Sequence, residues 1–183
     1  MTARLILISH ASTEALRQSA FPADESIDDK GRIRAVALAT HLPHADRCWT
    51  SPELRTRQTA DALQLNADVD PVLRDCDYGD WAGLSFDNVM VRDPEAASAW
   101  LRDPAATPPG GDSILSLMQR VAGWLAWQIT LHERTIIVTH PSIIRAAIVH
   151  AIEATPKTFF CIDITPLSMT RLSGADGRWN LRA

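Results

Sequence analysis

The sequence has few cysteines and no long hydrophobic run. The 183 residues include only three cysteines, Cys48, Cys76 and Cys161, which are far apart and form no CxxC pair. Such a set is typical of reduced thiols in the cytosol. The apolar run at residues 5–8 is too short for a signal-peptide core or a membrane span. We therefore expect a soluble, cytoplasmic protein with no membrane partner.

Positive charge is also scarce. The chain has 18 Lys and Arg residues against 22 Asp and Glu residues, a net charge of -4 and a pI near 5.8. Without a basic field, nucleic acid is not an expected partner, and an anionic ligand has to be held by a local pocket. The length and the 46% apolar content fit one globular domain over residues 1–183.

Signatures of two other hydrolase classes are missing. There is no G-x-S-x-G nucleophile elbow, which disfavours a Ser/His/Asp hydrolase. There is also no HExxH or HxH spacing, which disfavours a metal hydrolase built on His10, His140 and Asp75. Activity that is lost on chelation would favour the metal alternative. We expect no metal and no cofactor.

Strand-like and helix-like segments alternate along the chain and predict an α/β sandwich. A proline follows a capping residue at Ser51-Pro52 and predicts a helix start there, and the apolar residues 33, 36 and 37 recur at the spacing of an earlier helix. The predicted strands are residues 5–8, Arg47–Thr50 and 135–139, with edge strands at 158–164, 168–172 and 179–181. The predicted helices are residues 28–41, a helix from 52, 114–132 and 141–152.

Two histidines follow predicted buried strands directly. His10 comes after residues 5–8 and His140 after residues 135–139. Ligands of open α/β sheets bind at the carboxyl ends of the strands, so the pair predicts a site. Arg55, in the first turn of a helix, suits a phosphate oxygen, and Asp75 lies in a loop whose aromatic residues should raise its pKa for general-acid work. Taken singly, each of these residues has an ordinary structural interpretation.

Five short segments surround these candidates in a specific order along the chain. The segments are Leu-Ile-Ser-His-Ala-Ser-Thr at 7–13, Ser-Pro-Glu-Leu-Arg at 51–55, Leu-Arg-Asp at 73–75 with Gly-Asp-Trp-Ala-Gly at 79–83, Gly-Gly-Asp-Ser at 110–113, and Ile-Val-Thr-His at 137–140 with Ile-Arg at 144–145. Each motif is weak alone, but together and in this order they resemble the histidine phosphatase, or phosphoglycerate-mutase-like, superfamily.

The resemblance implies a three-layer α/β/α sandwich with a mostly parallel central sheet and edge strands. It also implies a phosphomonoester hydrolase that acts through phosphohistidine on a small phosphorylated metabolite. His10 would be the nucleophile, Arg55 and His140 would hold phosphate oxygens, and Asp75 would be the proton donor. Ser9 and Thr13 would also lie at the phosphate.

The sequence departs from the family pattern beside the nucleophile. Ser9 stands where the family has an arginine, so a charged fork is replaced by a neutral hydroxyl. Ala11 and Pro141 replace glycines, and Asp75 replaces the usual glutamate. A catalytically weakened phosphate- or phosphoester-binding relative is therefore the alternative function. Arg17 is a candidate to restore the missing charge.

The remaining alternatives concern size and assembly. A phosphoglycerate-type mutase is disfavoured, because residues 81–110 leave little room for a further segment that encloses substrate, and compact phosphatases of the family are closer in length. Trp124 and Trp127 on the long helix, with Trp100 upstream, form either core packing or the interface of a homodimer. The substrate itself is not predicted, because variable loops around Phe21, Phe86 and Trp100 would contact the leaving group.

Overall fold

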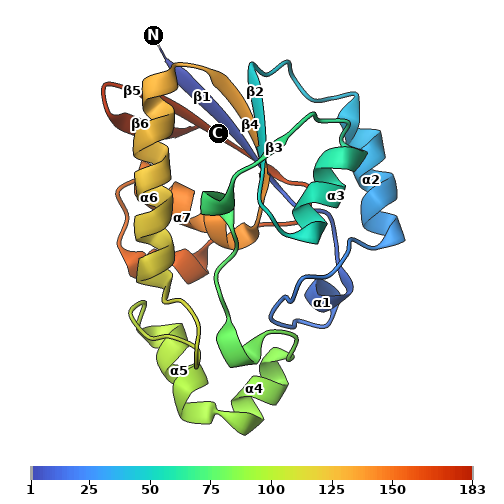
Figure 1. Cartoon of the computed structure of the whole chain (residues 1–183). Helices are drawn as coiled ribbons and strands as arrows, with labels where there is room; N and C mark the ends of the chain where they lie inside the picture. The colour runs from blue at the N-terminus through green and yellow to red at the C-terminus, as the bar shows by residue number, and fades with distance from the viewer. Residues whose placement is uncertain (1, 183) are drawn as a thin grey trace.

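A central six-stranded sheet organises the chain (Figure 1). A computed structural model describes residues 2–182. The strand order is β3-β2-β4-β1-β5-β6, in which β3, β2, β4 and β1 are parallel and β5 and β6 are antiparallel additions. The strands are β1 (Ala3–Ser9), β2 (Arg47–Thr50), β3 (Asp68–Val69), β4 (Arg134–Thr139), β5 (Met169–Ala175) and β6 (Arg178–Arg182). The mostly parallel sheet is confirmed.

Helices cover both faces of the sheet, with α6 and α7 on one side and α2 and α3 on the other, while α4 and α5 extend beyond one end (Figure 1). The α-helices are α1 (Glu14–Arg17), α2 (Asp29–Ala39), α3 (Leu54–Ala62), α4 (Phe86–Arg92), α5 (Pro94–Arg102), α6 (Ile114–Leu131) and α7 (Pro141–Ala151). The 3-10 helices are η1 (Pro71–Leu73), η2 (Gly79–Trp81) and η3 (Pro156–Cys161). The α/β/α sandwich is confirmed.

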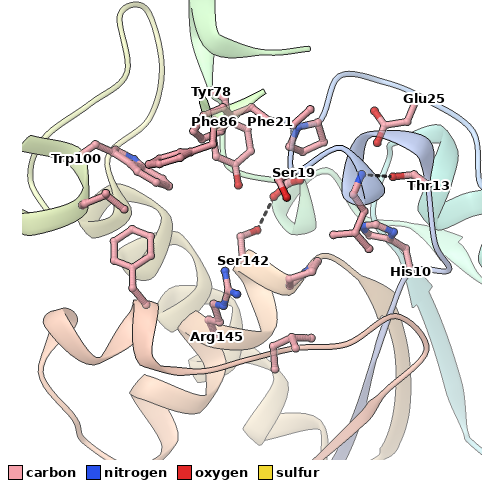
Figure 2. Close-up of a pocket in the computed structure, with 18 residues that line it drawn as sticks. His10, Thr13, Ser19, Phe21, Glu25, Tyr78, Phe86, Trp100, Ser142 and Arg145 are labelled. Carbon is pink, nitrogen blue, oxygen red and sulfur yellow. Dashed lines mark hydrogen bonds between the residues drawn. The ribbon is translucent and has the colours of Figure 1, made fainter. Parts of the chain in front are cut away.

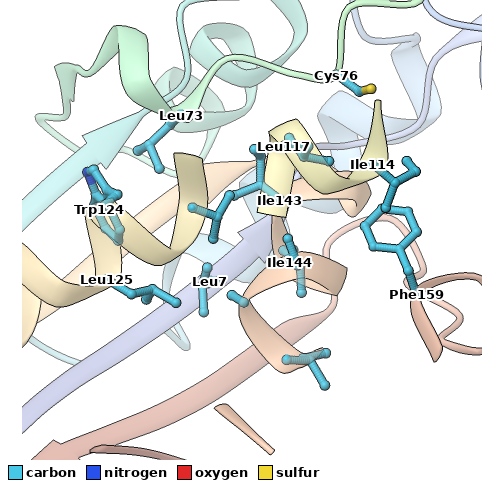
Figure 3. Close-up of a cluster of buried hydrophobic side chains, with 14 of the residues drawn as sticks. Leu7, Leu73, Cys76, Ile114, Leu117, Trp124, Leu125, Ile143, Ile144 and Phe159 are labelled. Carbon is cyan, nitrogen blue, oxygen red and sulfur yellow. The ribbon is translucent and has the colours of Figure 1, made fainter. Parts of the chain in front are cut away.

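Strand β1 is buried on both faces, which explains its unbroken apolar sequence. Leu5 and Leu7 pack into the larger cluster, together with α6 and α7, while Ile6 and Ile8 pack into the smaller cluster on the opposite face. Figure 3 shows Leu7 among side chains of the larger cluster. A central strand that is covered on both sides holds its carboxyl end, and hence His10, in a fixed position.

The start of α3 corrects the prediction that Ser51 caps a helix beginning at Pro52. The hydroxyl of Ser51 instead donates to the Leu73 carbonyl at 2.6 Å and pairs with the Thr139 hydroxyl at 2.8 Å. The helix begins at Leu54, with Glu53 at the N-cap position. Ser51 therefore ties β2 to β4 and to the loop that leads into Asp75.

Helix α2 was predicted correctly, although the apolar residues that predicted it lie on its exposed side. Asp28 caps the helix by accepting from Gly31 N–H at 2.7 Å. Ile33 and Val36 are 69% and 50% exposed, whereas Gly31 and Ala35 are buried. A Cβ on Gly31 would lie 2.8 Å from the backbone nitrogen of Ser12. The helix thus approaches the His10 loop through its small residues rather than its branched ones.

The segment 158–164 is not a strand. Most of it lies in η3, and Phe159 is buried in the larger core cluster. Tertiary packing thus outweighs the β-propensity of its aromatic and branched residues. The short helices α1, α4 and α5 were not predicted either. Within residues 2–182, no helix has the length and apolar content to cross a membrane.

Candidate active site

His10 lies at the carboxyl end of β1, where its side chain is almost fully buried. Its Nδ1 lies 2.8 Å from the Ala11 carbonyl. A carbonyl oxygen only accepts hydrogen bonds, so Nδ1 carries the proton and Nε2 keeps the lone pair of a neutral ring. Burial, followed by the nearby His140 and Arg55, lowers the pKa of His10 from 6.5 to about 3. His10 is therefore a neutral imidazole with one free nitrogen.

His140 occupies the equivalent place after β4, as the N-cap residue of α7. It is fully buried, and its ring centroid lies 5.5 Å from that of His10. Its Nε2 contacts Oε2 of Glu53 at 2.7 Å, and its Nδ1 lies 3.4 Å from Oδ2 of Asp75. The two histidines predicted from the sequence are thus brought together, and the second lies between two carboxylates.

Arg55 is buried in the first turn of α3. One Nη group donates to Asp75 at 2.6 Å and the other to the Ala23 carbonyl at 2.7 Å. Its Nε is buried without a hydrogen-bond partner, and so are Nδ1 of His140 and the Ser9 hydroxyl. Buried polar atoms are usually satisfied. A bound anion would supply the missing acceptor for Arg55 and His140.

Asp75 is ionised rather than held as an acid, which corrects the expected rise in its pKa. Burial alone would raise the pKa, but His140, Arg55, the Ser142 hydroxyl and the Cys76 amide together lower it to about 2. The Ser142 hydroxyl donates to Oδ1 of Asp75 at 2.5 Å. Opposite charges and donors around a buried carboxylate stabilise its charged form. In the free protein, Asp75 is therefore a base.

Two site residues, Glu53 and Ser142, were missed in the sequence. Glu53 accepts from the Asp75 amide at 2.9 Å through Oε1, while its other oxygen contacts His140. Its pKa is lowered: burial opposes this, but the contact with His140 outweighs the burial. The signals that could have identified them are a glutamate inside the segment that contains Arg55, and a serine two residues after His140.

Close contact between two loops positions Asp75. Gly79 has a φ of +51°, and a Cβ there would lie 2.1 Å from the Pro109 carbonyl. A Cβ on Gly111 would lie 2.5 Å from the Asp77 carbonyl, and Asp112 N–H donates to that carbonyl at 2.7 Å. The Gly-Gly-Asp-Ser segment therefore does more than open α6 at its Ser113 cap. It also supports the Asp75 loop.

His10 opens into a pocket of about 320 Å³ (Figure 2). Asp75, Thr13 and Ser142 also line it, whereas Arg55, His140 and Ser9 lie behind its surface. Aromatic side chains form much of the outer wall. Besides Asp75, the pocket is lined by the charged residues Arg145 and Glu25. The aromatic residues are Phe21, Tyr78, Phe86, Trp100 and Phe160.

The structure places the remaining candidates as follows. Thr13 is buried and caps α1, accepting from Leu16 N–H at 3.2 Å. The guanidinium of Arg17 pairs with Glu14 and, at 2.6 Å, with Asp28, and its side chain is 48% exposed. It is not among the residues that line the pocket, so the expectation that Arg17 replaces the missing charge is wrong in this structure.

The tryptophans that were expected in either the core or a dimer interface divide between the core and the surface. Trp100 and Trp124 are buried, whereas Trp127 is 45% exposed. The homodimer stays a prediction. Within residues 2–182, no group of three or more His, Cys, Asp or Glu side chains has the geometry of a metal site.

Comparison with known families finds a match over almost the whole chain. The model of the histidine phosphatase superfamily (branch 1) matches residues 5–183. A bifunctional protein of Mycobacterium tuberculosis is 30% identical over 192 residues, covering 98% of this chain but 52% of that protein. The chain thus spans about half the length of that relative. Phosphoserine phosphatase 1 of Hydrogenobacter thermophilus is 29% identical, covering 78% of this chain and 73% of that enzyme.

Solved structures share the arrangement of helices and strands. The mycobacterial glucosyl-3-phosphoglycerate phosphatase in complex with VO3 superposes with a TM-score of 0.87 at 26% identity, covering 98% of this chain and 97% of that one. The alpha-ribazole phosphatase of Shigella flexneri superposes with a TM-score of 0.87 at 24% identity, covering 98% and 94%. At this level of identity, the second likeness supports the fold alone.

Proposed function

Because the chain belongs to the histidine phosphatase superfamily, we propose that it hydrolyses a phosphate monoester of a small metabolite through a phosphohistidine at His10, without a metal ion. The observation that carries the proposal is the free Nε2 of a neutral, buried His10 beside the unpartnered donors of Arg55 and His140. A nucleophile and donors for a transferred oxyanion are the two requirements of this reaction.

In the first step, Nε2 of His10 forms a bond to phosphorus as the bond from phosphorus to the leaving oxygen breaks. The proton stays on Nδ1, which continues to donate to the Ala11 carbonyl, and this carbonyl stabilises the positive charge that develops on the ring. Nε of Arg55 and Nδ1 of His140 would donate to the phosphoryl oxygens. Water then attacks the phosphohistidine, releasing phosphate and neutral His10.

Asp75 needs a proton before it can assist the leaving alkoxide. A carboxylate with a pKa of about 2 is ionised in the free protein. A phosphate dianion bound beside it raises that pKa, because neighbouring like charges disfavour the ionised form, and it competes for Arg55 and His140. Asp75 would therefore take up its proton as substrate binds, donate it to the leaving oxygen, and accept one from the attacking water.

The test is hydrolysis of phenyl phosphate and a panel of phosphomonoesters by protein that has been freed of metal with a chelator. We expect turnover that His10→Ala abolishes and that His44→Ala, an exposed control, leaves unchanged. Rapid quenching with labelled substrate should trap an acid-labile phosphoryl group on the wild-type chain. Turnover that survives His10→Ala, or that requires added metal, would contradict the proposal.

A second candidate function is that of a catalytically weakened phosphoester-binding protein. Two observations favour it: Ser9 stands where the family has an arginine, and the carboxylates of Glu25, Glu53 and Asp75 lie around the site. A dianion then meets one buried guanidinium that is already paired. Hydrogen bonds to charged groups contribute about 1.5–3 kcal/mol each, so the missing arginine lowers the rate on the order of hundreds-fold.

The Ser9→Arg variant separates the two functions. If the natural chain is an adequate phosphatase, the variant changes its kcat by less than about tenfold. If the natural chain only binds, the wild type shows no turnover, and Ser9→Arg creates turnover that a further His10→Ala change removes. Binding of the product phosphate by calorimetry distinguishes a weakened binder from a chain that holds no phosphate at all.

A further inference from the structure

The outer part of the pocket contains one guanidinium that the reaction above does not use. Arg145 lies on α7 three residues after Ser142, and Pro141, Ser142 and Arg145 all line the pocket from the same helix face. In Figure 2 the Arg145 side chain points up toward Ser142, while Glu25 lies well apart from it, beside His10 and Thr13. The cation and this carboxylate therefore occupy separate parts of the pocket.

Arg145 is held in place by only part of its side chain. Its Nε donates to the Ile162 carbonyl at 2.7 Å, and its guanidinium carbon lies 5.8 Å from the centre of the Phe159 ring. Within residues 2–182, no carboxylate forms an ion pair with it, and its two Nη groups have no hydrogen-bond partner. An anchored arginine with two free, parallel donors is suited to bind a planar anion in a bidentate manner.

The pocket that Arg145 lines has a largely apolar and aromatic wall. Trp100 stacks edge to face on Phe160 with centroids 4.9 Å apart, and Phe21 lies 5.6 Å from Trp100 and 5.2 Å from Tyr78. Such a wall accommodates a flat or branched apolar group, and the partly buried guanidinium attracts an anion more strongly than it would in bulk water. Ligand pockets often combine an apolar lining with one or two polar groups of this kind.

From this geometry we infer that Arg145 binds a carboxylate on the leaving group, so that the preferred substrates are phosphate monoesters of apolar or aromatic alcohols that carry a carboxylate. The inference rests on the proposed function, since it concerns the part of the substrate that leaves. A carboxylate suits this position better than a second phosphate, because Asp75, which accepts from the neighbouring Ser142 hydroxyl, would repel a dianion more strongly than a monoanion.

Matched pairs of esters test the inference. The 3- and 4-carboxyphenyl phosphates are compared with the corresponding carbamoylphenyl phosphates, which have the same shape without the charge. We expect the kcat/KM of the wild type to be about tenfold or more higher for at least one carboxylate than for its amide, because a hydrogen bond to a charged group has an effect of this size. Arg145→Gln should remove this preference and leave phenyl phosphate within about twofold of wild type.

Two further variants guard against a general disturbance of the fold. Arg171→Gln removes an exposed arginine from β5 and should preserve the preference, while Arg145→Lys should retain a reduced part of it. Equal loss of activity toward phenyl phosphate and the carboxylated esters in Arg145→Gln would overturn the inference, because Arg145 would then act on the transferred phosphoryl group. Absence of any preference in the wild type would overturn it as well.

Calorimetric titration of the same pairs into His10→Ala protein gives a readout that is independent of turnover. We expect a carboxylate to bind about tenfold more tightly than its amide, and the difference to disappear when Arg145→Gln is added. Failure of the proposed function would show as this binding preference without hydrolysis by the wild type. Failure of the inference would show as equal binding of carboxylate and amide, whether or not hydrolysis occurs.

Discussion

The floor and the wall of the pocket are built in different ways. The floor, defined as His10, Glu53, Arg55, Asp75 and His140, comes from the ends of two strands, the start of α3 and the Asp75 loop. The polar groups of Glu53, Arg55, Asp75 and His140 contact one another at 2.6–3.4 Å. The wall, defined as Phe21, Tyr78, Phe86, Trp100 and Phe160, comes from loops and short helices and packs through aromatic rings. The difference suggests that the floor determines the reaction and the wall determines which substrate undergoes it.

Removing the cation of the floor should have the largest effect. In Arg55→Gln, the buried Asp75 carboxylate loses its 2.6 Å partner. Breaking a buried pair on one side costs about 3–5 kcal/mol, and kcat/KM should fall by at least ~10³ for every ester. Urea unfolding and phenyl phosphate kinetics measure both effects. Arg57→Gln, which changes an exposed residue of the same helix, is the control. An unfolding midpoint in Arg55→Gln equal to that of the wild type would contradict the role of Arg55 as the partner of Asp75.

Replacing Glu53 should have a smaller effect that is still uniform across substrates. Glu53→Gln keeps the size of the side chain but leaves His140 or the Asp75 amide without an anionic acceptor. We expect kcat/KM to fall by about 10- to 100-fold for charged and uncharged leaving groups alike. Glu95→Gln, on the exposed side of α5, should match the wild type. A loss that is confined to one class of ester would place Glu53 with the wall instead.

The buried floor should also make stability depend on pH. The pKa of His10 is about 3 in the folded chain, against 6.5 as its ordinary value. Between these values the unfolded chain binds more protons, so the free energy of unfolding falls as the pH is lowered, by no more than ~1.4 kcal/mol per pH unit for this one group. We expect the free energy of unfolding, measured with urea at pH values from 7 to 4, to depend less steeply on pH in His10→Gln than in the wild type. His44→Gln should run parallel to the wild type.

A change in the wall should alter preference more than rate. Trp100→Leu removes the ring that contacts Phe21 and Phe160. We expect the ratio of kcat/KM for naphthyl phosphate to that for methyl phosphate to fall by about two- to tenfold, the range of one aromatic contact. Trp127→Leu, which is half-exposed, should leave the ratio unchanged. An equal loss for both esters would show that Trp100 supports the floor.

The floor could be predicted from the sequence far better than the wall. His10 and His140 follow buried strands whose position in a parallel sheet is set by their apolar runs, and Arg55 lies in a helix that was predicted, although the helix begins at Leu54 rather than at Pro52. Glu53 could not be assigned, because its contact with His140 joins residues 87 positions apart. The ionised state of Asp75 depends on the same long-range contacts.

The wall depends on packing that local patterns do not determine. Helices α4 and α5 have 7 and 9 residues, too few for a clear helical period, and were predicted as part of a loop region. The residues of η3 favour a strand intrinsically, yet Phe159 faces the core while Phe160 lines the pocket. Arg145 belongs to a recognised motif, but its free donors become evident only when Ile162 and the aromatic residues surround it.

The backbone contact between Gly79 and Pro109 has a consequence for sequence variation in this protein. The two residues lie 30 positions apart, and even a methyl group on Gly79 would overlap the Pro109 carbonyl. Residues 104–112 are therefore not a free surface loop that tolerates insertions, although their Pro- and Gly-rich composition suggests one. We expect an insertion beside Pro109 or a side chain at Gly111, which would lie 2.5 Å from the Asp77 carbonyl, to displace the Asp75 loop and lower activity, although neither change touches His10.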